Sequence, residues 1–407
     1  MKKIAAILLI AVLTLGMLVG CHLKTPGSTS SHSGQDPDGP ALSEQTANAE
    51  EPLTEPVSPA ETTPNPAVPE PASPVLQIAM ITDGSSLDYD DMTQLTFAGI
   101  KEFASETGSS YWYCICEDAY DTNKVLDAVG DAVSDGANVI VCPGWMFETG
   151  VYEAQKAYPN VNFLLVDGEP HDSSYLYYET AENTHCILYR SEEAGFLAGY
   201  ATVKDGYRNL GILAAIAVNE VIRYNYGFIQ GANLAAEELG VADEVTIRLW
   251  YCDQFYSDEN IVSEMKLWYE DGVEAIFACG GGLYLGASEA ADSYGGKVIG
   301  CDYDVSEYEP NILTSAVKFY DESVRLSLWD LYRNGGKWPY EFAGRTVYLG
   351  LADDCLGLPT ISGAWRFRQF SLSDYNDICS RIRRGQVTVS NDTESLPDVS
   401  VNVDYIP

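Results

Sequence analysis

Basic residues are scarce in this chain. Among its 407 residues there are 23 Lys and Arg against 60 Asp and Glu, which gives a formal net charge of −37 at pH 7. A protein this acidic repels phosphate backbones and anionic membrane surfaces, so nucleic acid is excluded as an expected partner. The same charge disfavours phosphorylated and dicarboxylate ligands and favours neutral small molecules.

The chain also has few histidines and lacks the common catalytic motifs. Of the four histidines, His22 and His32 lie near the N-terminus, His171 lies in a polar loop and His185 begins an apolar run. The sequence contains no G-x-S-x-G motif, no phosphate-binding loop and no histidine pair at metal-ligand spacing. We therefore expect a protein that is not an enzyme and that uses no cofactor and no metal.

Cysteine is present ten times but never as a C-x-x-C motif. Beyond Cys21 an odd number remains, and most of these nine lie in apolar runs that are typical of strands. This placement predicts buried free thiols rather than a disulfide framework. A metal or disulfide role for Cys114 and Cys116 is the alternative.

The N-terminus has the features of an export and anchoring signal. Lys2 and Lys3 precede an apolar run over residues 4–19 that is too short for a confident transmembrane helix, which predicts a signal peptide over residues 1–20. The run ends in Leu18-Val19-Gly20-Cys21, which resembles a bacterial lipobox and predicts lipidation of Cys21. Residues 22–75 hold eleven of the nineteen prolines, so residues 21–75 are predicted to form a flexible tether. We expect a protein held on the extracytoplasmic face of the cell membrane by this lipid anchor alone.

From residue 75 onward, short apolar runs alternate with amphipathic segments. This order is typical of βαβ units and parallel sheets, so an α/β protein with two doubly wound parallel-sheet lobes is expected. We divide it as follows: an N-terminal lobe of residues 76–187 plus about 316–343, a C-terminal lobe of 188–315 plus about 344–388, and a tail of 389–407.

Acidic residues and glycines follow several of the predicted strands. Asp83 and Asp88 follow the first strand, Gly280-Gly281-Gly282 follow a later one, and Asp302-Tyr303-Asp304 follow the next. In open parallel sheets, ligands bind beyond the carboxyl ends of the strands. Carboxylates accept hydrogen bonds from vicinal hydroxyls, so these positions indicate a site for a neutral polyol, although aspartates there also serve as helix N-caps.

Several ordered motifs resemble those of the basic membrane protein family of substrate-binding lipoproteins, which includes purine nucleoside receptors of ABC importers. The resemblance covers roughly residues 76–388. The motifs fall on the following segments: 83–94, 143–147, 192–200 (E-E-A-G-F-L-A-G-Y), 223–231 (R-Y-x-x-G-F-x-x-G), 280–282, 300–304 and 314–318.

This resemblance implies a type I periplasmic-binding-protein fold whose two lobes, joined by a hinge, close on a nucleoside. It places the ribose-binding positions at Asp83, Gly281, Asp302 and Lys318. It places the base-stacking positions at Met92 and Tyr224, and a polar base-reading residue near 145–149. With Asp88, Thr93 and Trp145, these positions form the predicted ligand site.

The chain departs from the family pattern at the base. Met92 and Thr93 replace a phenylalanine and an asparagine, and Thr149, beside Glu148, replaces an aspartate. Met92 can still pack on a ring, and Trp145 could supply the missing face. The identity of the base therefore stays open.

We expect a lipid-anchored solute-binding protein that captures a nucleoside, with a purine as the favoured base, for the permease subunits of an ABC importer. Two alternatives stay open: a tethered sensor that signals through a partner, and a binding protein retargeted to a sugar or another neutral polyol.

Overall fold

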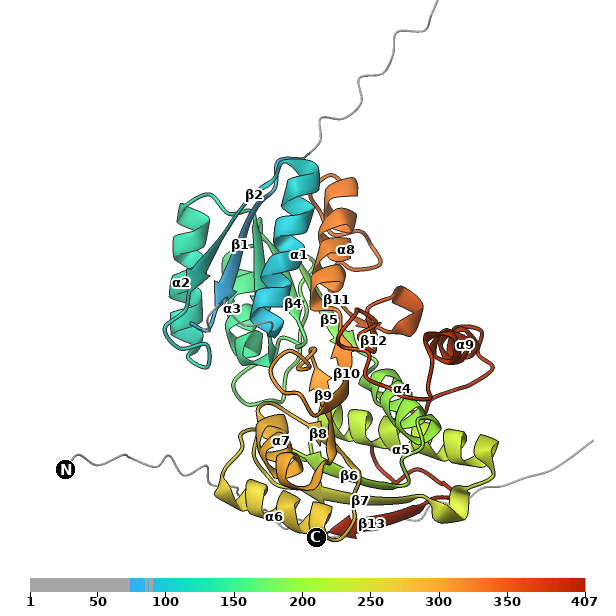
Figure 1. Cartoon of the computed structure of the whole chain (residues 1–407). Coiled ribbons are helices and arrows are strands. Elements are labelled where there is room, and N and C mark those ends of the chain that lie inside the picture. Colours follow the sequence, from blue (N-terminus) through green and yellow to red (C-terminus); the bar gives the residue numbers. More distant parts are fainter. Residues whose placement is uncertain (1–73, 85–86, 88–90, 407) are drawn as a thin grey trace, which may run out of the picture. The chain divides into compact units, whose positions relative to one another are not determined.

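The computed structural model describes residues 74–84, 87 and 91–406. Their strands form two sheets, each with helices on both faces (Figure 1). The predicted signal peptide, Cys21, Asp88 and all but the last two residues of the predicted tether lie outside the described residues. Across the described ranges, no helix has the length and apolar character needed to span a membrane.

The first sheet has six strands, and every pair in it is parallel. Their spatial order is β11 (Arg345–Leu349), β5 (Thr184–Tyr189), β4 (Asn162–Val166), β3 (Val139–Pro143), β1 (Gln77–Thr82) and β2 (Ser110–Ile115). Successive residues of a strand point to opposite faces, so Met80 and Ile81 of β1 enter two different cores.

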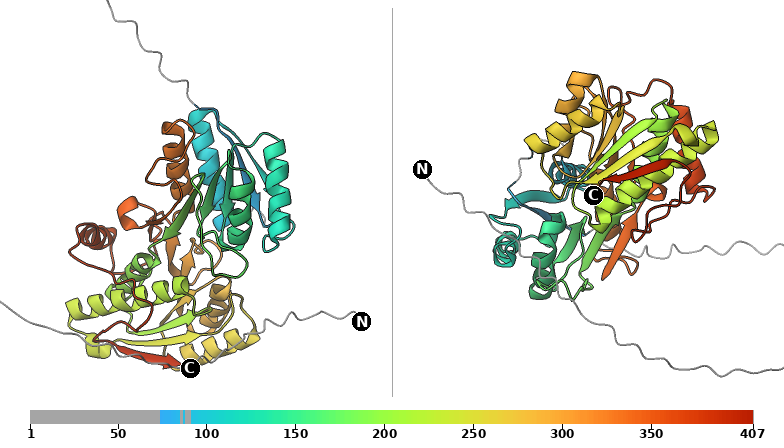
Figure 2. Two further views of the ribbon diagram at one scale, coloured as in Figure 1. Left: turned by 180° about the vertical axis from the view of Figure 1, so that it is seen from behind. Right: turned by 90° about the horizontal axis from the view of Figure 1, so that it is seen from below.

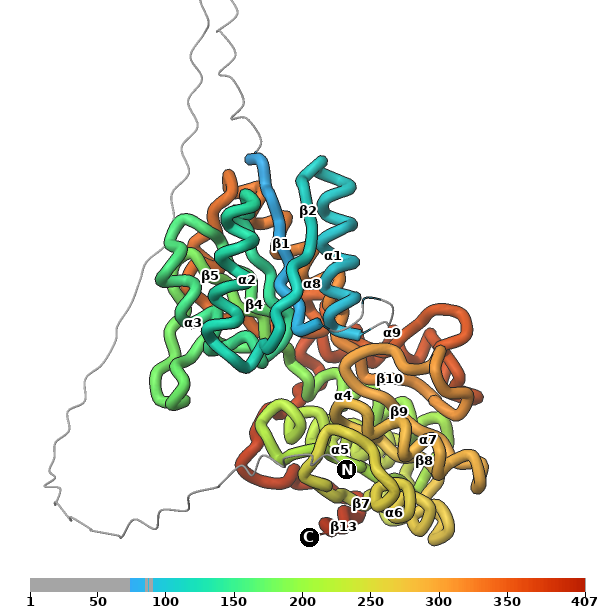
Figure 3. Tube along the Cα trace, turned by 90° about the vertical axis from the view of Figure 1, so that its left-hand side faces the viewer, coloured from blue at the N-terminus to red at the C-terminus, as the bar shows by residue number. Residues whose placement is uncertain are grey.

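Two pairs of helices cover this sheet. On one face lie α1 (Met92–Thr107) and α8 (Tyr320–Arg333), which run side by side although they are far apart in sequence (Figure 3). On the other face lie α2 (Thr122–Ser134) and α3 (Glu148–Ala157). Helix α1 begins where the side chain of Asp91 accepts the Gln94 N–H, an ordinary N-cap.

The second sheet has seven strands, and all of its pairs are parallel except that of β12 with β10. Their spatial order is β12 (Leu356–Gly357), β10 (Ile312–Lys318), β9 (Lys297–Asp302), β8 (Ala275–Cys279), β6 (Asn209–Ala214), β7 (Thr246–Tyr251) and β13 (Asn402–Ile406). One face is covered by α4 (Ser191–Lys204) and α5 (Asn219–Leu239), and the other by α6 (Glu259–Glu270) and α7 (Leu283–Tyr294).

Glycines allow α4 and α5 to approach each other closely. A Cβ on Gly195 would collide with the carbonyl of Tyr224, and one on Gly199 with the carbonyl of Phe228. Both glycines belong to the E-E-A-G-F-L-A-G-Y motif, whose four-residue spacing puts them on one helix face. This close packing fixes the position of α5, which carries Tyr224.

The chain crosses between the two sheets three times, after β5, after β10 and after β11. Two of the crossings are joined directly, since the Arg190 N–H donates to the Leu349 carbonyl at 2.9 Å. The described part also contains α9 (Leu372–Arg383), which contacts α4, and three short 3₁₀ turns: η1 (Trp145–Phe147), η2 (Ala242–Glu244) and η3 (Leu351–Asp353).

The late part of the chain differs from the sequence-based division. Strand β11 pairs with β5 in the first sheet, although residues from about 344 were assigned to the C-terminal lobe. Strand β10 lies wholly in the second sheet, although the assignment changed at about 316. The assigned tail contains β13, which pairs with β7 at the edge of the second sheet (Figure 2). Apolar patterning predicts a strand but does not encode which sheet edge it joins.

All nine cysteines in the described part are free, and seven of them are buried. This finding confirms the prediction of free thiols.

Candidate ligand-binding site

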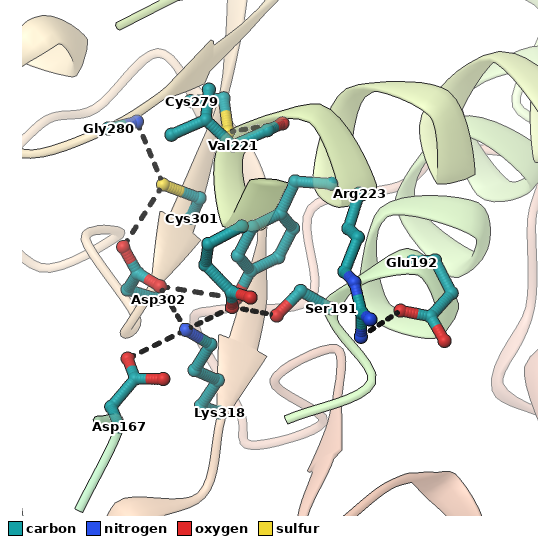
Figure 4. Close-up of polar contacts among 12 residues, drawn as sticks. Asp167, Ser191, Glu192, Val221, Arg223, Cys279, Gly280, Cys301, Asp302 and Lys318 are labelled. Atoms are coloured by element: carbon teal, nitrogen blue, oxygen red, sulfur yellow. Dashed lines mark hydrogen bonds and ion pairs between the residues drawn. The ribbon is translucent and has the colours of Figure 1, made fainter. Parts of the chain in front are cut away.

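A buried lysine collects carboxylates from several elements. Lys318 is the last residue of β10, and its side chain is 1% exposed. Its Nζ lies 2.8 Å from Asp167 Oδ2, 2.6 Å from Glu220 Oε1 and 3.2 Å from Asp302 Oδ1 (Figure 4). We call Lys318, Asp167, Glu220 and Asp302 the lysine cluster.

The cluster joins the two sheets at the carboxyl ends of their strands. Asp167 follows β4 of the first sheet, whereas Asp302 ends β9 and Lys318 ends β10 of the second. Glu220 lies in the first turn of α5. Asp167 and Asp302 have φ values of 61° and 66°, a left-handed conformation in which the strand stops and the chain turns. The ends of parallel strands thus bring together Asp167 and Lys318, which are 151 positions apart in the sequence.

Charge pairing decides the ionisation of the cluster. Burial alone would lower the pKa of Lys318, but Asp167 and Glu220 outweigh it and hold that pKa well above its usual value. Burial, together with the negative charges of Glu220 and Asp302, outweighs the attraction of Lys318 and raises the pKa of Asp167 to about 6. Three carboxylates around one ammonium leave the site with an excess of negative charge.

Aromatic side chains enclose the lysine cluster. The Tyr224 hydroxyl donates to Asp302 Oδ1 at 3.3 Å, and the Tyr320 hydroxyl donates to Asp167 Oδ2 at 3.3 Å. The Lys318 Nζ lies 5.3 Å from the ring centroid of Tyr189 and 5.4 Å from that of Tyr224. The Ser191 hydroxyl donates to Glu220. These contacts hold the charged groups in one arrangement.

The glycine turn after β8 is linked to Asp302 through a thiol. Gly280 and Gly281 have φ values of 129° and 49°, and a Cβ on Gly281 would collide with the Phe255 carbonyl. The Gly280 N–H donates to Cys301 Sγ at 3.1 Å, and the Cys301 thiol donates to Asp302 Oδ2 at 3.5 Å (Figure 4). The turn and the carboxylate are therefore positioned together.

The structure brings together three of the predicted residues, namely Tyr224, Asp302 and Lys318. Gly281 lies one residue from the Gly280 contact with Cys301. Tyr224 is only 2% exposed, and its ring packs against Phe277 as well as under Lys318.

The other predicted residues lie at neighbouring strand ends of the first sheet. Asp83 is exposed just after β1, Met92 begins α1, Thr93 beside it is buried, and Trp145 lies in η1 after β3.

The polar residues predicted to read the base are engaged inside the lobe. Glu148 Oε1 accepts the Glu169 N–H at 2.8 Å, and Glu148 Oε2 lies 3.0 Å from His171 Nε2. Burial raises the pKa of Glu148. The Thr149 hydroxyl accepts a hydrogen bond from Thr122 at 3.1 Å.

Sequence reasoning missed Asp167 and Glu220. Asp167 was the last residue of a predicted strand, so the strand-end rule used for Asp83 and Asp302 would have found it. Glu220 had no such signal, because its place depends on how α5 packs. Taken over the described ranges, no group of three His, Cys, Asp or Glu side chains is arranged to hold a metal ion.

Comparison with known protein families identifies the family to which this chain belongs. The model of the family described as "ABC transporter substrate-binding protein PnrA-like" matches residues 76–387. The chain belongs to this family. The predicted family is thereby confirmed, and the protein is an ABC transporter substrate-binding protein.

Curated relatives of this PnrA-like protein include two proteins of Borreliella burgdorferi. Basic membrane protein B is 24% identical over 71% of this chain and 82% of its own length. Basic membrane protein D is 27% identical over 69% of this chain and 78% of its own length.

Solved structures confirm the fold. An ABC transporter solute-binding protein from Conexibacter woesei matches with a TM-score of 0.62 at 15% identity, covering 78% of this chain and 99% of that one. One from Aeropyrum pernix matches with a TM-score of 0.60 at 18% identity, covering 78% and 94%. The PnrA-like protein thus has the predicted type I solute-binding fold.

Proposed function

We propose that this PnrA-like protein captures a nucleoside between its two lobes, at the lysine cluster. The observation that carries the proposal is that one buried lysine holds carboxylates from the strand ends of both sheets. Such carboxylates accept hydrogen bonds from the vicinal hydroxyls of a sugar, and charged acceptors make strong ones. The excess negative charge favours a neutral ligand over a phosphorylated one.

Capture follows from closure of the lobes. A ligand that contacts Asp167 on one side and Asp302 on the other stabilises the arrangement in which both carboxylates face it. Only this difference in affinity between open and closed forms can shift the equilibrium between them. The three crossings between the sheets are the segments about which the lobes would rotate. No bond is made or broken in this process.

We propose the same anchoring and partner that the sequence predicts. Cys21 carries a lipid that holds the protein on the extracytoplasmic face of the membrane, and the permease subunits of an importer receive the ligand. The lipobox-like segment supports the first proposal, and membership of an ABC transporter family supports the second. Cells that express the protein with labelled palmitate should label it, and Cys21→Ser should abolish the label.

Thermal unfolding of the purified protein tests the ligand class. A ligand that binds only the native state raises the unfolding midpoint, and at 100 times its Kd it stabilises by about 2.7 kcal/mol. We expect a shift with one or more of adenosine, guanosine, inosine, cytidine and uridine, and none with neutral sugars. A shift of the midpoint with a sugar alone would show that the ligand is a neutral polyol and not a nucleoside. No shift with any nucleoside would contradict the proposal.

A further inference from the structure

Two aromatic side chains stand at the strand ends of the first sheet. In the order β3-β1-β2, Asp83 follows β1, Tyr120 follows β2 by five residues and Trp145 follows β3 by two. The strand order reverses between β1 and β3, and a ligand of an open parallel sheet binds in the crevice outside such a reversal. Both rings therefore flank the place where the fold receives a ligand.

The rings are exposed, and they contact each other. Tyr120 is 63% exposed and Trp145 is 50% exposed. Their ring centroids lie 5.5 Å apart at an interplanar angle of 67°, an edge-to-face pair. Paired aromatic rings left open to solvent at a ligand-receiving crevice are typical of a surface that a ligand covers.

Hydrogen bonds hold the backbone beside each ring. The turn before Trp145 needs Gly144, whose φ is 106° and whose N–H donates to the Val166 carbonyl at 2.7 Å. Met92 packs on this turn, since a Cβ on Gly144 would lie 2.8 Å from Met92 Cε. The Tyr120 N–H donates to Asp118 Oδ1 at 3.0 Å. Partial burial raises the pKa of the Tyr120 hydroxyl, and the Asp83 carboxylate adds to this effect.

The hydrogen-bonding side chains beside Trp145 are turned inward. Glu148 holds the Glu169 amide and His171, and Thr149 holds Thr122. What this turn exposes is half of the Trp145 side chain. A base that covered this ring would contact it by stacking, which suits every nucleobase because every base has a π-face.

We infer that Tyr120 and Trp145 form an aromatic contact surface for the planar ring of the ligand, and that Tyr120 is a ligand-contact residue of this protein. The inference rests on the proposed function, because it assumes that a nucleoside enters between the lobes. The inference adds one contact to the proposed site. The lobe of the first sheet stacks a ring on the ligand, beside the polar contacts that the lysine cluster makes.

Calorimetric titration with adenosine and with uridine tests the inference. The proteins compared are wild type, Tyr120→Ala, Trp145→Ala, Tyr120→Phe and, as a matched control, Tyr177→Ala. Tyr177 is 67% exposed on the same lobe, in a loop after β4. Because both target rings are exposed, their removal should leave the unfolding midpoint of the free protein unchanged.

We expect Tyr120→Ala and Trp145→Ala each to weaken both nucleosides by about tenfold or more, as loss of a stacking ring does. Tyr120→Phe and Tyr177→Ala should bind as wild type does. If wild type binds nucleoside and the two alanine variants bind equally well, the inference is wrong and the proposed function stands. If wild type binds neither adenosine nor uridine, nor any other nucleoside, the proposed function and the inference fail together.

Discussion

The two lobes would offer the proposed ligand different kinds of surface. The lobe of the seven-stranded sheet contributes Glu220, Tyr224, Asp302 and Lys318, all joined by hydrogen bonds or ion pairs. The lobe of the six-stranded sheet contributes exposed rings after β2 and β3 and, among the cluster carboxylates, only Asp167. Charge is thus placed where neighbours hold it rigidly, and apolar contact surface is left open.

Physical cost explains this difference. A buried charge is expensive unless it is paired and hydrogen-bonded, so charged ligand contacts must be built as a complete network before the ligand arrives. An exposed aromatic ring costs little and becomes favourable only when a ligand covers it. Substitutions on the charged side should therefore change both stability and binding, whereas substitutions on the aromatic side should change binding alone.

The largest effect is expected from Lys318→Met. Without the buried ammonium, three partly exposed carboxylates face one another, and breaking a buried pair typically costs about 3–5 kcal/mol of unfolding free energy. Urea unfolding measures this loss. Lys266→Met is the matched control, because the Lys266 pair with Glu289 is exposed at the surface and should cost about 1 kcal/mol or less. Equal stability of the two variants would show that the cluster does not depend on its lysine.

The next largest effect is expected from His185, a buried side chain that stays neutral in the folded protein. The His185 ring lies tilted against the rings of Trp338 and Phe342, and burial lowers its pKa to about 4. Because the unfolded chain binds a proton at about pH 6.5, unfolding free energy should fall by roughly 3 kcal/mol as pH drops from 6.5 to 4.

Asp167 acts in the opposite direction over part of this range. Its raised pKa, about 6, makes stability fall as pH rises from about 4 to 6. The contribution of His185 is therefore read from the difference between wild type and His185→Gln in unfolding experiments from pH 4 to 7. Parallel pH profiles for the two proteins would contradict the neutral, buried histidine.

Asp302→Ala should weaken nucleoside binding by about 1–3 kcal/mol, because a charged hydrogen bond to the ligand is lost. Isothermal titration measures the change. Asp398→Ala removes an exposed carboxylate from the C-terminal segment of the same lobe and should leave the affinity unchanged. An unaltered affinity for Asp302→Ala would remove this residue from the site.

The smallest effect is expected at Cys301. Its thiol joins the Gly280 N–H to Asp302, so Cys301→Ala should weaken binding by about 1 kcal/mol or less, the worth of a weak hydrogen bond. Cys301→Ser keeps a donor and an acceptor and should restore the affinity. If the serine and alanine variants bind alike, the thiol only fills space.

Most of the fold could be predicted from the sequence, because strand and helix patterns alternate regularly along the chain. The family motifs also predicted that Tyr224, Asp302 and Lys318 belong to one site, and these three residues contact one another in the structure. The division into lobes misplaced β11 and left β13 in the tail. Both are half-exposed edge strands, and their residue patterns do not indicate which sheet they join.

Residues that depend on packing were harder to find. Glu220 contacts Lys318 from the first turn of α5, a helix that glycines allow to lie close against α4. Tyr120 stands in a loop five residues beyond β2, and its exposure and its contact with Trp145 are properties of the folded chain. Neither pattern nor spacing distinguishes these two residues from other surface residues of their type.

The proposal that carboxylates from both lobes hold the ligand's sugar is tested most directly by removing the sugar hydroxyls. Calorimetric titration would compare a nucleoside that binds, such as adenosine, with its 2′,3′-dideoxy analogue, which keeps the base and loses both vicinal hydroxyls. A site built on hydrogen bonds to hydroxyls rejects the analogue strongly, so we expect its affinity to fall by a factor of at least about 100. Equal affinity for the two compounds would contradict recognition of the sugar by the lysine cluster.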